Sequence, residues 1–199
     1  MKPNHTRERG ATLVVALVML VVLTLIGVQA ARMALLDEKS ARAGRDREIA
    51  FQAAEAALRD AWADIDSGLR VPLFDGAPSG FDAGCANVAL PADAAAAATN
   101  RRGLCVPNEA SDPRQMWQDV DLATRAVPFG TFTSRPWDNS QTPAPVYLVE
   151  SLPFDCVGCG VQSTSSEPDQ LAFRVTAVGY GPAGSNIEVA LQSYYVKTR

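Results

Sequence analysis

The chain has 199 residues, of which 47% are hydrophobic, with 18 Lys and Arg against 22 Asp and Glu. This length allows one globular domain with an extension, and the hydrophobic content is sufficient for a core. The net charge of −4 argues against a protein whose main surface binds nucleic acid. The single histidine, His5, lies near the N-terminus. Triads and metal sites that require histidine are therefore disfavoured, and we expect no enzyme, no cofactor and no metal site.

A charged leader over residues 1–10 ends at Gly10, where an apolar run begins. Residues 11–31 contain no charged side chain. A helix of this length reaches about 32 Å, which matches the hydrocarbon core of a membrane. An ordinary secretory signal would have a shorter apolar core followed by a break, but no proline follows until Pro72. The sequence therefore predicts a transmembrane helix over 11–31.

Helix-favouring residues continue beyond this span as far as Gly68, which suits a helix C-terminus. In this second part, apolar side chains recur at steps of three and four, which predicts a packing stripe on one helix face. The stripe consists of Phe51, Ala54, Leu58, Ala61 and Ile65. We expect one continuous helix over 11–67, with lipid or other subunits around its first half. A simple single-span anchor is the alternative, but it does not explain a stripe suited to packing.

A globular domain is predicted over 68–199. Its first part is rich in Pro, Gly and Asp, which indicates loops. The stretch "LPADAAAAATN" is either a short helix with Asp93 near its start or a flexible insert, and "SDPRQMWQDVDLAT" predicts one more helical turn. Strand patterns come late, in "VYLVESL", "LAFRVTAVGYG" and "IEVALQSYYVK", with a turn between the last two. We expect an antiparallel sheet of three or four strands against the helix stripe, and thus an α+β fold.

Four cysteines, Cys85, Cys105, Cys156 and Cys159, all follow the predicted span. Four cysteines allow three pairings. We favour disulfides Cys85–Cys105 and Cys156–Cys159 in an oxidising compartment. Two other interpretations of "CVGC" stay open. A redox-active pair usually lies at a helix start, and a four-thiolate zinc site usually has two C-x-x-C pairs, which the spacing of Cys85 and Cys105 does not supply.

No pattern of catalytic residues stands out, because no two carboxylates are singled out by their spacing. The glycines in "GYGPAG" join two strands, so they do not form a phosphate-binding loop. Three aromatic residues, Trp117, Phe132 and Trp137, are either exposed interaction residues or core residues. We favour the core for each of them.

The N-terminal stretch resembles a type IV prepilin, with a basic leader ending in "RG" and an apolar core ending in "LTLIG". More narrowly, this stretch through "RDREIAFQAAEAALRDA" is similar to the N-terminal region of the PilX family of minor pilins. The later segments "YLVESLP" and "FRVTAVGYGPAGSNIEVALQSYYV" resemble the terminal strands of that family. Residues 70–145 show no resemblance that we identify.

This resemblance implies that a prepilin peptidase cleaves between Gly10 and Ala11 and methylates the new amino group of Ala11. It also implies a single-pass protein of the inner membrane, with its C-terminal domain in the periplasm, that later enters the pilus fibre or its tip. The expected partners are other minor pilins, the major pilin, the prepilin peptidase, the inner-membrane assembly platform and a tip adhesin. The expected role is to prime pilus assembly.

The sequence departs from the pattern of major pilins at two positions. Pilins commonly have Phe first and Glu fifth in the mature chain, where this chain has Ala11 and Val15. In major pilins the glutamate is thought to pair with the N-terminal ammonium of a neighbouring subunit inside the fibre. A subunit at the very tip has no neighbour above it, so Val15 fits a tip position. A tolerated variation without positional meaning is the alternative.

Two alternative functions stay open. A pseudopilin of a type II secretion system would also fit the missing acid, although tip pseudopilins usually carry a larger inserted domain than this chain allows. A membrane-anchored adhesin or DNA-uptake module would be expected to show a basic or aromatic surface, which the sequence does not clearly show. Lysine and arginine counts on the two sides of the span do not fix its orientation. Because all four cysteines follow the span, we place the leader in the cytoplasm.

Overall fold

The computed structural model describes residues 9–75, 80–107, 116–152 and 170–198. Its helices are α1 (Arg9–Ser67), α2 (Ala94–Ala98), α3 (Met116–Asp119) and α4 (Leu122–Arg125), with a 3₁₀ helix, η1 (Val71–Phe74). Its strands are β1 (Asp82–Ala83), β2 (Leu104–Val106), β3 (Val127–Pro128), β4 (Val146–Ser151), β5 (Gln170–Tyr180) and β6 (Glu188–Thr198). The chain divides within α1 into two compact units, Met1–Arg45 and Asp46–Arg199, which are described separately.

The first unit is the N-terminal part of α1, in which every described side chain from Thr12 to Arg45 is exposed. This part is long and apolar enough to cross a membrane, with a mean hydropathy of 2.8 over its most apolar stretch. A helix satisfies its own backbone hydrogen bonds, as a membrane interior requires. Gly27 and Gly44 do not interrupt the helix, and a side chain at either position would meet no atom within 4 Å.

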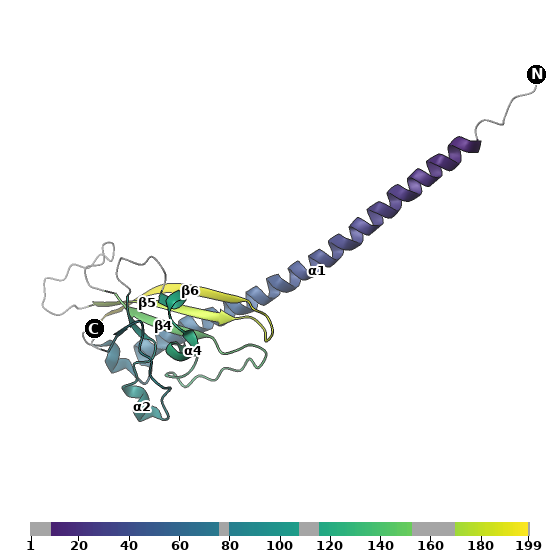
Figure 1. Ribbon diagram of the computed structural model, residues 1–199. Coiled ribbons are helices and arrows are strands. Elements are labelled where there is room, and N and C mark those ends of the chain that lie inside the picture. The colour runs from purple at the N-terminus through teal and green to yellow at the C-terminus, as the bar shows by residue number, and fades with distance from the viewer. Residues whose placement is uncertain (1–8, 76–79, 108–115, 153–169, 199) are drawn as a thin grey trace, which may run out of the picture. The chain divides into compact units, whose positions relative to one another are not determined.

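The second unit is built on a six-stranded sheet in the order β1-β2-β4-β5-β6, with β3 also paired to β4. The three long strands β4, β5 and β6 are antiparallel, as predicted, and lie side by side in Figure 1. The short strands β1 and β2 extend the sheet in parallel, so the sheet is mixed rather than purely antiparallel. These short strands escaped prediction because two or three residues are too few to show an alternating pattern.

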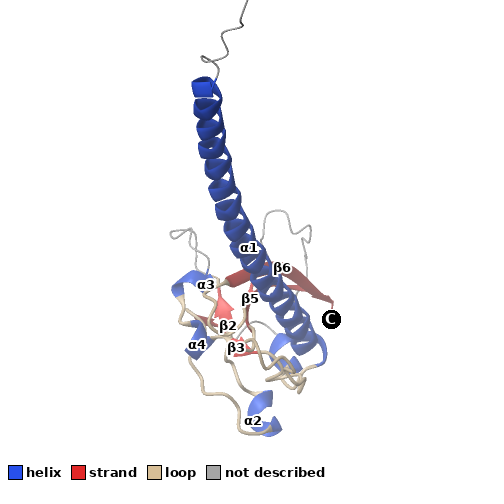
Figure 2. Cartoon of the chain, turned by 90° about the vertical axis from the view of Figure 1, so that its right-hand side faces the viewer, coloured by secondary structure: helices blue, strands red, loops and turns tan. Residues whose placement is uncertain are grey.

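Residues 46–67 of α1 belong to the second unit and pack against β5 and β6 (Figure 2). The helix and sheet approach closely because small residues line the contact, with Ala50, Ala54 and Ala61 fully buried. Gly179 of β5 lies where a side chain would collide with the helix backbone. Phe51 departs from the predicted stripe, since it is 39% exposed. The periodicity was right, but the buried face is centred on alanines beside Phe51.

Two hydrophobic clusters flank the sheet. The larger cluster lies between the sheet and α1 and includes Ile65, Phe74 and Phe132, together with Tyr147 and Phe173. The smaller cluster lies on the opposite side of β4 and β5, where the disulfide cysteines and Val146, Leu148 and Val178 meet partly buried residues of the 117–122 segment. Phe132 is thus a core residue, as favoured, whereas Trp117 and Trp137 are half-buried.

The short helices follow local capping rules. The Asp93 side chain accepts a hydrogen bond of 2.7 Å from the Ala96 amide, which fixes the start of α2. The alanine-rich stretch is therefore a short helix and not an irregular insert. Asp121 caps α4 in the same way through the Ala123 amide at 3.0 Å.

Candidate assembly interface

The exposed apolar surface of α1 is the first candidate for a functional surface. Side chains from Leu13 to Leu36 that would normally be buried are largely exposed, among them Val15. Across residues 12–36 the only charge is Arg32, and the first acid is Asp37. A surface of this kind needs a dry environment, supplied either by lipid or by neighbouring apolar helices.

The predicted processing residues lie at the N-terminal end of this helix. α1 begins at Arg9, so Gly10 and Ala11 are in its first turn. Val15 lies one turn further on, with its side chain exposed. The structure places these three residues on one short stretch of helix. The first charged pair with a described contact comes much later, between Glu38 and Arg42, whose side chains meet at 2.6 Å.

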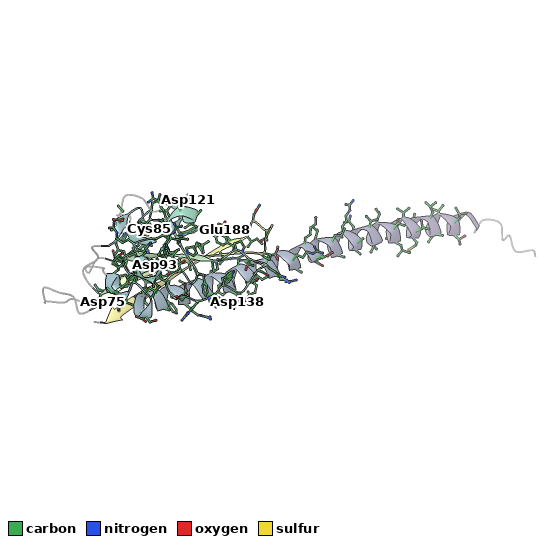
Figure 3. The ribbon with its side chains drawn as sticks, turned by 90° about the horizontal axis from the view of Figure 1, so that it is seen from below. Asp75, Cys85, Asp93, Asp121, Asp138 and Glu188 are labelled. Atoms are coloured by element: carbon green, nitrogen blue, oxygen red, sulfur yellow. A yellow bond between two sulfur atoms is a disulfide. The ribbon has the colours of Figure 1, made fainter. Side chains whose placement is uncertain are left out.

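A disulfide joins Cys85 and Cys105, as predicted. Both residues are buried, and the bond ties the start of the connecting region, residues 68–145 between α1 and β4, to strand β2. Cys85 lies on the same side of the second unit as Asp121 (Figure 3). Its backbone adopts a positive φ of 62°, and its carbonyl accepts a hydrogen bond from Arg125. The other predicted pair, Cys156 and Cys159, lies outside the described residues.

Removing this disulfide will destabilise the second unit. The bond closes a loop with a sequence separation of 20 residues. By loop entropy, the double substitution Cys85→Ala and Cys105→Ala should lower the free energy of unfolding by about 3 kcal/mol. Denaturant unfolding of the purified full chain in detergent, followed by tryptophan fluorescence, measures the difference. A loss under about 1 kcal/mol would show that the hydrogen bonds from Arg102 and Arg125 to backbone carbonyls hold the connecting region without the disulfide.

Two arginines hold the connecting region by donating to backbone carbonyls. Arg102 is 7% exposed, and its guanidinium donates to the carbonyls of residues 88, 123 and 126. Arg125 donates to the carbonyls of Gly84 and Cys85 at 2.7 and 2.5 Å. Burial is the main cause that lowers the pKa of Arg102, and the nearby Asp121 opposes this shift. These contacts supply order where the sheet contributes only two short strands.

A buried ion pair lies under the end of α1. Asp64 and Arg70 are both fully buried, and the guanidinium donates to both carboxylate oxygens at 2.7–3.1 Å. The Tyr147 hydroxyl donates to the same carboxylate at 2.8 Å, and Arg70 lies 3.8 Å from the Phe132 ring centroid. Burial, then the charge of Asp64, raises the pKa of Tyr147 well above its usual value. Arg70 also donates to carbonyls of residues 100 and 102, so one side chain joins the helix end to the connecting region.

A second buried acid, Asp60, precedes Asp64 by one helical turn. Its carboxylate accepts hydrogen bonds from the Gly130 amide at 2.7 Å and from the Thr133 hydroxyl. Burial is the largest influence and raises the pKa of Asp60, while these hydrogen bonds oppose it. The contact fixes the loop after β3 onto α1.

Sequence reasoning missed these buried polar residues. Asp60 and Asp64 are spaced i, i+4 on the same helix face as Leu58, Ala61 and Ile65. Their position on this apolar face was the one signal in the sequence that these acids are buried. The groups that donate to these carboxylates are an amide, a guanidinium and two hydroxyls from loops and from β4, and helical periodicity does not place them beside the helix. Within the ranges that the structure describes, no group of three or more His, Cys, Asp or Glu side chains is arranged to hold a metal ion.

Two family models match the chain. The one described as PilX N-terminal matches residues 9–59, and the one described as type IV pilus assembly protein PilX C-term matches residues 86–197. No curated protein and no solved structure matches the chain. The first match covers most of α1, and the second covers Cys105, both Arg102 and Arg125, and nearly all of the three long strands. The second match alone spans more than half of the chain's residues. This chain therefore belongs to the PilX family of type IV pilus assembly proteins.

Proposed function

We propose that this chain is a minor pilin that primes assembly of the type IV pilus and sits at or near the tip of the fibre. Membership of the PilX family supports a minor pilin of the type IV pilus. The observation that carries the finer proposal is the exposed apolar helix surface with Val15, and no acid, at the fifth position after Gly10. If a neighbouring subunit lay above this one in the fibre, its N-terminal ammonium would be buried without a carboxylate partner, because this chain has Val15 in place of the acid. A buried charge without a partner is costly. A terminal position removes the need for that partner.

The proposal includes the route to the fibre. The prepilin peptidase removes residues 1–10 and methylates Ala11, and residues 11–31 then hold the subunit in the inner membrane. The domain after the helix lies in the periplasm, where a disulfide such as Cys85–Cys105 can form. Exchange of lipid for neighbouring helices is a small change in apolar contact, so packing and polar pairs must favour assembly. The partners are the other minor pilins, the major pilin and the assembly platform.

Replacing Gly10 will block maturation. Gly10 has no side chain, so the backbone can approach a protease active site closely. We expect Gly10→Leu to accumulate as the unprocessed chain in the membrane fraction, while Gly27→Leu, a matched glycine substitution in the same helix, is processed normally. Mass spectrometry of the N-terminal peptide measures both outcomes. Normal cleavage of Gly10→Leu would contradict the prepilin proposal, and a methylated Ala11 in the wild type would support it.

The priming role makes a separate prediction. Deleting the gene should reduce surface pili severalfold while the major pilin stays in the membrane, and the wild-type gene should restore the pili. Gold labelling of an epitope on the second unit should mark fibre ends. Normal piliation would contradict priming, and label along whole fibres would contradict a tip position. Loss of protein secretion with intact pili would instead identify a type II pseudopilin.

A further inference from the structure

The outer edge of β6 is the longest unprotected strand edge in the part of the chain that the structure describes. β6 ends the sheet order, and none of the described strands pairs with its other side. Its pairing with β5 runs without a bulge from Gln170 opposite Thr198 to Tyr180 opposite Glu188. From Val189 to Val196 the strand has no charge and no proline. Proteins usually protect a sheet edge with a bulge, a charged side chain or a proline, or by covering the edge or keeping the edge strand short.

The register shows which backbone groups face outward. The Gly181 amide donates to the Ile187 carbonyl at 2.9 Å, so these residues form a hydrogen-bonded pair at the end of the ladder. Such pairs alternate along an antiparallel ladder. The odd-numbered residues of β6 therefore bond to β5. The even-numbered residues, which include Ala190, Tyr194 and Val196, direct their N–H and C=O groups away from it.

The side chains of Tyr194 and Val196 form an exposed apolar patch. Tyr194 is 68% exposed and Val196 is 55% exposed, more than any other large hydrophobic residue described in the second unit. Both lie on the sheet face opposite to α1, because the intervening Tyr195 stacks on Trp62 of the helix. One segment of the surface thus offers both a row of backbone groups and apolar side chains at alternate positions.

We propose that the outer edge of β6 is a docking site for an extended, uncharged segment of another protein, which adds to the sheet as a further strand. Only an extended polypeptide presents donors and acceptors at the spacing that this edge requires. The absence of charge from Val189 to Val196 calls for an uncharged segment, with β-branched or aromatic residues opposite Tyr194 and Val196. The inference does not depend on where in the fibre the chain lies.

A second copy of β6 is a poorer occupant than such a segment. In antiparallel pairings centred on residues 192 or 193, Val196 would face Glu188 or Ala190 of the other copy, and Tyr194 would face Ala190 or Gln192. These residues are small or polar, so the exposed apolar side chains would remain poorly covered. Pairings centred on residues 194 or 195 would place Tyr194 opposite Tyr194 or Val196, but they pair only residues 190–198 or 192–198 of the two strands. A segment of different sequence can match both the full length of the edge and its side chains. A parallel pairing in register would bring the two Glu188 side chains together, and likewise the two Lys197 side chains.

Photo-cross-linking of the full chain in piliated cells tests the proposal. A benzophenone amino acid is placed at Tyr194 or Val196, with Tyr195, the neighbouring tyrosine on the helix-facing side, as the matched control. We expect cross-links from 194 and 196 to two residues of a different protein that are two positions apart in one segment. We expect none from 195. Mass spectrometry of the cross-linked peptides gives these positions.

Variants at the edge complete the test. Ala190→Pro removes an outward N–H, and Val196→Lys puts a charge on the patch. Val106→Lys puts the same charge on an exposed valine of β2 and serves as the control. We expect the yield of the Tyr194 cross-link to fall about tenfold in the two edge variants, the effect of about 1.4 kcal/mol, and to stay unchanged in the control. An unchanged thermal midpoint shows that each variant is folded.

Cross-links to lipid, to the same chain, to scattered positions or to a second copy would overturn the proposal. Yields of the Tyr194 cross-link that the edge variants leave unchanged would also overturn it.

Discussion

Replacing Gly179 with valine will unfold or severely destabilise the second unit. A Cβ at this position would lie well inside van der Waals contact of the Ala50 carbonyl oxygen and the Ala54 amide nitrogen, and 3.0 Å from the Ala53 carbonyl carbon. These are backbone atoms of a helix, so no side chain can rotate away. The helix must lift from β5, which opens the alanine-lined contact beneath it. We expect a loss of about 4 kcal/mol or more in the free energy of unfolding.

Glycine substitutions elsewhere supply the control. A side chain at Gly44 would meet no atom within 4 Å, so Gly44→Ala should stabilise the helix by about 1 kcal/mol. Gly179→Ala should already destabilise the fold. Denaturant unfolding of the full chain in detergent compares the three variants. If Gly179→Ala is neutral, the helix does not approach β5 as closely as described.

Breaking the buried pair between Asp64 and Arg70 will have an effect of similar size. Asp64→Asn removes the negative charge and leaves the guanidinium of Arg70 buried without a counter-charge. We expect the free energy of unfolding to fall by about 3–5 kcal/mol, because an unpaired buried charge is the main penalty. The variant also weakens the hydrogen bond from the Tyr147 hydroxyl, which adds to the loss. Chemical denaturation monitored by circular dichroism provides the measurement.

A double-mutant cycle separates the pair from its surroundings. Asp64→Leu combined with Arg70→Met removes both charges, so the double variant should be more stable than the sum of the single losses predicts. It should not recover wild-type stability, because the carbonyls of residues 100 and 102 lose their donor. Glu55→Gln breaks an exposed pair with Arg59 and should cost no more than about 0.5 kcal/mol. Additive losses across the cycle would show that the two side chains act independently.

The elements with strong local patterns could be predicted from the sequence. The absence of charge over 11–31 and the lack of proline up to Pro72 indicated the long helix, and α1 ends at Ser67, just before Gly68. Alternation predicted the three long strands. The Cys85–Cys105 bond agrees with the favoured pairing.

Features that depend on tertiary contact could not be predicted. Phe51 fits the helical period, but the close approach at Gly179 centres the contact on alanines, which carry little hydrophobic signal. The short strand β2 depends on pairing with β4, and β1 on pairing with β2, and neither depends on its own sequence pattern. Asp60 and Asp64 appear as ordinary helix acids until the loops that donate to them are in place.

The arginine contacts of the connecting region have an evolutionary consequence. Arg102 and Arg125 donate to main-chain oxygens, and every amino acid supplies the same oxygen. Val88 is half-buried and Ala123 is exposed, so substitutions at these two positions can change the surface of this region without removing the groups that hold its shape. A pilus component that must vary its outer face while its assembly surfaces stay fixed would gain from such a design. The two arginines themselves become the positions at which variation is least tolerated.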